Sequence, residues 1–228
     1  MAYRVPRFLP IATLFLASLG LTRAQIPQAR VITELTEAEQ TKFVNETIAA
    51  GFPDDRADQM TMLVLNRSAL VLPLLEQRVE DELRLQAPSK ELIETATEMI
   101  AYAGDEQALR EVTKLIAIDG ARFGRLVERA LDNALDFRNP FMVAYRGLDI
   151  GSEATSKRIA EWADTRLGLP KMQRLLAEAM LERYEQIPSE AGWNSDPVVS
   201  RLKNGVSVGL RQKLVDFAAS SEKKKTLQ

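Results

Sequence analysis

The stretch Ser89–Arg138, SKELIETATEMIAYAGDEQALREVTKLIAIDGARFGRLVERALDNALDFR, contains three helical patterns in about fifty residues. In each pattern the apolar residues recur every three or four positions, which is the spacing of one helix face. We expect Gly104 and Gly120 to end the first and second helices, and Asp105 to cap the start of the second. The third helix should stop near Asn139-Pro140, because proline cannot continue a helix.

Helical spacing continues on both sides of this stretch. Thr36 and Glu39 have the spacing of a capping box at a helix start, and Gly51-Phe52-Pro53 should end that helix. Further helices are predicted from Asp54 or Asp55, and from Ser68, where Pro73 could kink or open the first turns. The predicted fold class is therefore all-α.

One part of the chain can be aligned with a later part. Five positions align at a constant offset of 47: Gly104, Glu106, Arg110, Val112 and Leu115 with Gly151, Glu153, Lys157, Ile159 and Trp162. Leu126 and Val127 align with Leu175 and Leu176 at an offset of 49, and with Leu74 and Leu75 at an offset of 52. Repeats of about 47–49 residues, each built from two or three helices, are typical of helical solenoids.

Two segments carry a family resemblance. Gly104-Asp105-Glu106 leading to Leu109-Arg110, and Asp196-Pro197-Val198-Val199-Ser200-Arg201-Leu202, resemble the inter-helix turn and following helix of HEAT and armadillo repeats. The resemblance covers roughly Asp54 to Ala219. It implies that Asp105 with Arg110, and Asp196 with Arg201, tie neighbouring units together, although Ser152 replaces the aspartate of the middle copy. It also implies a short right-handed helical solenoid that binds a partner; the alternative fold is an irregular helical bundle.

The first 24 residues have the features of a secretory signal peptide. Arg4 and Arg7 precede an uncharged apolar run from Phe8 to Leu21, and Thr22-Arg23-Ala24 has small residues where a signal peptidase needs them. The run is shorter than the ~20 apolar residues of a membrane-spanning helix, so we expect cleavage and no stable membrane span afterwards. The predicted organisation is a signal peptide at 1–24, a linker at 25–33, a helical repeat domain at 34–219 and a disordered tail at 220–228.

The net charge of the chain and its lack of cysteine bear on its cellular location and on the class of partner it could bind. Three of the 30 basic residues precede Gln25, so the mature chain has 27 basic against 32 acidic residues. An acidic balance argues against nucleic-acid binding. An exported chain of this size without cysteine fits a bacterial source, and a periplasmic or extracellular location. The sequence does not predict an oligomeric state.

The chain has no histidine and no cysteine, which excludes several chemistries. Ser-His-Asp and Cys-His catalysis need an imidazole, and most zinc sites and helical di-iron sites need histidine or cysteine ligands. We therefore predict no metal, no cofactor and no assigned catalytic residue. The acidic row Glu91, Glu94 and Glu98 could suggest a glycosidase, but negative charge in a first helical turn complements the helix dipole.

A basic row and three further residues are candidates for partner binding. Arg122, Arg125 and Arg129 recur on one predicted helix and could bind a carboxylate, although pairing with Glu128 and Asp132 on the same helix is favoured.

Tyr145, Arg146 and Trp193 are residue types that often anchor interfaces, although Trp193 could instead pack back onto the last helices. The sequence thus favours an exported, non-catalytic interaction protein that binds a protein or peptide. The alternatives are a carboxylate-dependent hydrolase acting on polysaccharide and, less specifically, a lipid-binding protein.

Overall fold

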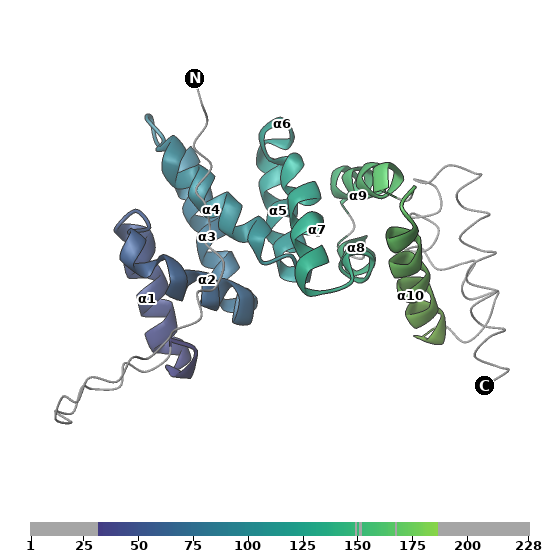
Figure 1. The fold of residues 1–228 in the computed structure, drawn as a ribbon. Helices are drawn as coiled ribbons and strands as arrows, with labels where there is room; N and C mark the ends of the chain where they lie inside the picture. The colour runs from purple at the N-terminus through teal and green to yellow at the C-terminus, as the bar shows by residue number, and fades with distance from the viewer. Residues whose placement is uncertain (1–31, 149, 151, 167, 187–228) are drawn as a thin grey trace, which may run out of the picture. The chain divides into compact units, whose positions relative to one another are not determined.

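The computed structural model describes residues 32–148, 150, 152–166 and 168–186, and in these ranges all regular secondary structure is helical. The prediction of an all-α chain is confirmed (Figure 1). The α-helices are α1 (Glu37–Ala49), α2 (Ala57–Asn66), α3 (Ser68–Leu83), α4 (Lys90–Tyr102), α5 (Glu106–Ile118), α6 (Gly120–Phe123), α7 (Arg125–Phe137), α8 (Pro140–Leu148), α9 (Glu153–Arg166) and α10 (Pro170–Gln186). Two short 3-10 turns, η1 (Ile32–Glu34) and η2 (Asp54–Arg56), lie on either side of α1.

The first helix begins and ends as predicted. The Thr36 hydroxyl accepts a hydrogen bond from the Glu39 backbone N–H, and the Glu39 carboxylate accepts one from the Thr36 backbone N–H, which is a complete capping box. After α1, Gly51 and Phe52 both have positive φ, at 75° and 59°. The next helix starts slightly later than expected, because Asp54–Arg56 forms a 3-10 turn before α2.

The central helices confirm the predicted Asp105 cap and the predicted turn at Gly104, show a Ser89 cap that was not predicted, and correct one predicted helix end. Ser89 and Asp105 cap α4 and α5 through their side chains, and Gly104 between these helices has a φ of 55°. Gly120 does not end α5. The non-helical backbone of Asp119 ends it, and the Asp119 side chain then accepts a hydrogen bond from Arg122 N and starts α6 at Gly120.

The helices pack mainly against neighbours that are close in chain order. The α3 helix packs against α4 and α5, and α4 also packs against α5 and α7 (Figure 1). Further along, α7 packs against α8 and α9, and α8 packs against α9 and α10. Apolar side chains from all of these helices form one buried core. Packing between near neighbours is what a solenoid requires, but the right-handed solenoid itself stays a prediction.

The aligned positions have similar surroundings in α5 and α9. Glu106 and Glu153 are the first residues of these helices. Val112 and Ile159 are both fully buried, and Leu115 and its counterpart Trp162 are at most 1% exposed. These three aligned pairs therefore take corresponding places in the two helices.

Several predictions lie outside the described residues. They concern the signal peptide at 1–24, most of the linker, Gly151, the Asp196 to Arg201 segment, Trp193 and the tail at 220–228. Among the helices that the structure does describe, none combines the length and apolar character needed to cross a bilayer.

Candidate functional site

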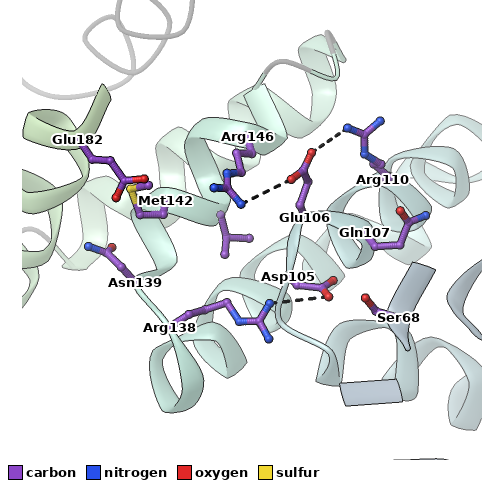
Figure 2. A pocket seen from close by; sticks show the side chains of 11 residues that line it. Ser68, Asp105, Glu106, Gln107, Arg110, Arg138, Asn139, Met142, Arg146 and Glu182 are labelled. Atoms are coloured by element: carbon purple, nitrogen blue, oxygen red, sulfur yellow. Dashed lines mark hydrogen bonds and ion pairs between the residues drawn. The ribbon is translucent and has the colours of Figure 1, made fainter. Parts of the chain in front are cut away.

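A groove of about 660 Å³ lies where the N-terminus of α5, the turn between α7 and α8, α8 itself and α10 come together (Figure 2). Its charged lining residues are Asp105, Glu106, Arg110, Arg138, Arg146 and Glu182. The remaining lining residues are Ser68, Gln107, Asn139, Met142 and Val143. We call this feature the arginine groove, because three guanidinium groups line it.

Asp105 positions one wall of the groove. Its Oδ1 accepts a hydrogen bond from Ala108 N at 2.9 Å, which caps α5. Its Oδ2 lies 3.7 Å from Nη1 of Arg138, the residue that follows α7. The cap thus holds a carboxylate, 14% exposed, opposite the end of another helix.

Glu106, the first residue of α5, lies between two arginines. Its Oε1 is 2.7 Å from Nη2 of Arg110, one turn later in the same helix. Its Oε2 is 3.8 Å from Nη1 of Arg146, which projects from α8. The HEAT resemblance implied that Asp105 and Arg110 tie neighbouring units together. In the structure Arg110 pairs with Glu106 of its own helix, whereas Asp105 pairs with Arg138 after α7.

Asn139 connects the helices on the other side of the groove. Its Oδ1 accepts a hydrogen bond from Phe141 N at 3.0 Å, next to Pro140 at the start of α8. Its Nδ2 donates to the Leu175 carbonyl oxygen of α10 at 2.7 Å. One side chain therefore caps α8 and ties α10 to it.

Arg138 and Arg146 have unused hydrogen-bonding capacity. A guanidinium carries five N–H donors, and the acidic contacts of these two arginines, at 3.7 and 3.8 Å, are ion pairs too long to be hydrogen bonds. Within the part of the chain that the structure describes, neither guanidinium donates a hydrogen bond. Their side chains are 37% and 58% exposed, so these donors are open to a ligand.

The predicted arginine row is not one continuous surface. Gly124 separates α6 from α7, which places Arg122 on α6 and Arg125 and Arg129 on α7. Arg122 lies over the Phe123 ring, whereas Arg129 pairs with Glu98 of α4. None of the three arginines lines the groove.

The expected pairing of this row with acidic residues on its own helix is wrong. Glu128 pairs with Arg158 of α9, at 3.7 Å. Asp132 accepts hydrogen bonds from Trp162 Nε1 at 2.9 Å and from Arg166 at 2.6 Å, both also on α9. The α7 acids therefore bind the next layer of helices instead of neutralising their own helix.

The other predicted site residues have different positions. Arg146 lines the groove, but its neighbour Tyr145 is only 4% exposed. Tyr145 therefore belongs to the core and not to an accessible binding surface. In the acidic row, Glu91 is in the first turn of α4, and Glu94 pairs with Lys90 at 3.6 Å.

A buried charged cluster beneath the groove was not predicted. Glu76 of α3 and Glu111 of α5 are 5% and 1% exposed, and both pair with Lys114. Burial raises the pKa of Glu76 to about 7. Gln107, which lines the groove, donates a hydrogen bond to Glu111. A signal was present in the sequence, because Glu111 lies on the apolar face of α5 between Ala108 and Leu115.

The groove offers charge and hydrogen-bond donors for binding a polar ligand. Among the residues that the structure describes, no group of acidic side chains is placed to hold a metal ion. Comparisons with family models, with curated protein sequences and with solved structures each return no match.

Proposed function

We propose that this protein is an exported, non-catalytic interaction protein that binds a protein or peptide partner through the arginine groove. The observation that carries the proposal is that the guanidinium groups of Arg138 and Arg146 line a groove of about 660 Å³ and donate no hydrogen bond to any described residue. Arginine is one of the residues that most often dominate binding energy at interfaces. Ligand sites typically have volumes of roughly 300–1,000 Å³.

The helical framework supports a binding role. The groove residues Asp105 and Asn139 are helix caps, so their positions are set by backbone hydrogen bonds. Side chains held by regular helices form more precise sites than side chains on loops. Packing between helices that are near neighbours in the chain, together with the aligned positions of α5 and α9, supports the solenoid architecture. Solenoids typically present extended binding surfaces.

Export rests on the N-terminal sequence. The basic start, the apolar run and the small residues before Gln25 support secretion and removal of the first 24 residues. We expect the secreted or periplasmic fraction to contain a chain that starts at or near Gln25. N-terminal sequencing of the purified protein measures this directly, and an intact Met1 on that protein would contradict it.

A carboxylate-dependent hydrolase is the second candidate, because carboxylates lie on two sides of the groove. Figure 2 shows Glu182 of α10 across from Asp105 and Glu106. Glycoside hydrolysis usually needs one protonated carboxylic acid and one carboxylate on either side of the bond. Asp105 accepts a hydrogen bond from a backbone N–H and Glu106 faces two guanidiniums, so the carboxylates of that wall already have partners within the protein.

Selection from a random peptide library, followed by cross-linking, tests the interaction proposal. The chain has no cysteine, so Ser68→Cys introduces a single attachment site for a photoreactive group at the groove. Asn45→Cys, on the exposed side of α1, is the matched control outside the groove. We expect selected peptides to cross-link from residue 68 and not from residue 45.

Two results would overturn the interaction proposal. One is a selection that enriches no peptide, and the other is equal cross-linking from residues 68 and 45. Hydrolysis of a polysaccharide panel that is abolished by Glu182→Gln would favour the second candidate instead.

A further inference from the structure

Charge is unevenly distributed around the arginine groove. The wall formed by α5, the end of α7 and α8 carries the guanidiniums of Arg110, Arg138 and Arg146, but only the carboxylates of Asp105 and Glu106. This wall therefore has one positive charge in excess. Figure 2 shows Arg138 and Arg146 turned toward that pair of carboxylates, one guanidinium toward each.

Glu106 illustrates how the groove accommodates a carboxylate. Each of its two oxygens faces a different guanidinium, and its closest contact, with Arg110, is 2.7 Å. Hydrogen bonds between guanidinium and carboxylate are about twice as strong as neutral ones, because both partners are charged. Arg138 has no comparable partner, since its ion pair with Asp105 spans 3.7 Å.

We infer that the ligand of the arginine groove is a peptide segment carrying an aspartate or glutamate side chain, whose carboxylate binds between Arg138 and Arg146. This inference rests on the proposed function and specifies its partner. A ligand carboxylate at this place would accept hydrogen bonds from the guanidinium N–H groups that donate to none of the described residues. It would also neutralise the excess positive charge of the wall.

Glu182 restricts how such a segment can lie. It is exposed and projects from α10 on the opposite side of the groove. A second acidic residue of the ligand next to Glu182 would be repelled, whereas a neutral or basic residue would be accepted. The bound segment should therefore place its acidic residue toward α8 and a residue without negative charge toward α10.

A matched pair of fluorescent peptides tests the inference by anisotropy. One peptide alternates glutamate with glycine, and the other replaces every glutamate by glutamine; both have an amidated C-terminus. We expect the glutamate peptide to bind and the glutamine peptide to bind at least about tenfold more weakly, since charge-assisted hydrogen bonds are lost. Raising the salt concentration should weaken the binding of the glutamate peptide.

Three substitutions in the groove should change the affinity for the glutamate peptide in opposite directions. Arg138→Gln and Arg146→Gln should each weaken binding of the glutamate peptide about tenfold, and Glu182→Gln should strengthen it by about threefold through loss of repulsion. Arg125→Gln is the control, because Arg125 is an exposed arginine outside the groove. Circular dichroism of each variant checks that the fold is retained.

The outcomes separate this inference from the proposed function. If library-selected peptides cross-link at the groove but lose no affinity when their acidic residues become amides, the carboxylate inference is wrong and the interaction function stands. If no peptide binds at the groove, both are wrong. Stronger binding of the glutamate peptide, weakened by Arg146→Gln and unaffected by Arg125→Gln, supports both.

Discussion

The backbone of Gly104 lies directly against the backbone of Ala134, so that a Cβ atom on residue 104 would be 2.7 Å from Ala134 N. Gly104 links α4 to α5 with a φ of 55°, a conformation that favours glycine. Beside this contact, Asn133 Nδ2 donates a hydrogen bond to the Ala101 carbonyl oxygen at 3.0 Å. The same glycine thus forms the turn before the groove residue Asp105 and allows α7 to approach.

Gly104→Ala should lower the free energy of unfolding by about 2–4 kcal/mol. A left-handed alanine costs roughly 1–2 kcal/mol, and a clash with backbone atoms that cannot move aside adds about 1–2 kcal/mol more. Urea denaturation followed by circular dichroism measures the change. Gly51→Ala is the matched control, because its φ is 75° but no atom lies within 4 Å of the added Cβ. Equal losses at the two positions would contradict the close approach at Gly104.

Asp132→Ala should destabilise the contact between α7 and α9 by about 1–3 kcal/mol, because the indole N–H of Trp162 loses its acceptor. Trp162 is 1% exposed. Asp132→Asn keeps an oxygen for the indole and weakens only the contact with Arg166, so its loss should stay below about 1 kcal/mol. Thermal unfolding of both variants measures the difference. A loss with asparagine as large as that with alanine would show that the Arg166 contact dominates.

Asn139→Ala should weaken both the start of α8 and the attachment of α10. Loss of the cap costs about 1 kcal/mol, and the Leu175 carbonyl oxygen loses its donor at the same time. Asn139→Asp separates the two effects, because an aspartate can still cap α8 but cannot donate to Leu175. We expect faster amide hydrogen exchange in α10 for both variants, but in the first turn of α8 only for alanine. Unchanged amide hydrogen exchange in α10 of both variants would show that the Asn139–Leu175 hydrogen bond does not hold α10 in place.

The features that could be predicted from the sequence are those set within a few residues. The Thr36 capping box, the Asp105 cap and the Gly104 turn each depend on groups no more than about four positions apart, and the structure confirms all three. The separation of α6 from α7 at Gly124 was not predicted, because the apolar spacing continues from Phe123 to Leu126 across the point where α7 begins.

The arginine groove could be predicted only in part, because its residues meet through packing. Arg146 was identified as a candidate by residue type, but Arg138 and Glu106 were not. Their pairing partners lie 33 and 40 positions away in the chain, respectively. Sequence spacing instead favoured partners on the same helix, as for Arg129, whose actual partner Glu98 belongs to another helix. Ion pairs between helices have no local sequence pattern to indicate them.

The ionisation of Glu76 should make the stability of the α3–α5 contact depend on pH. Its carboxylate is faced by Glu80 from its own helix and by Glu111 and Lys114 from α5, and burial raises its pKa to about 7. Lys114 stays protonated in this range, since its hydrogen bond to Glu111 raises its own pKa further. In the unfolded chain the pKa of a glutamate is about 4.3. Between these two values the folded protein holds a proton on Glu76 that the unfolded chain has released.

The contribution of Glu76 to the free energy of unfolding should therefore fall as the pH rises from about 4 to about 7. The total decrease is on the order of 4 kcal/mol, taking about 1.4 kcal/mol for each pH unit between the two pKa values. Glu76→Gln removes this titration but keeps a side chain of similar shape. Relative to the natural protein, the variant should gain stability steadily over this range and no further above it. Urea denaturation at several pH values, with the exposed Glu94→Gln as control, measures the effect. Parallel stability curves for the natural protein and Glu76→Gln would show that Glu76 ionises as readily in the folded chain as in the unfolded one.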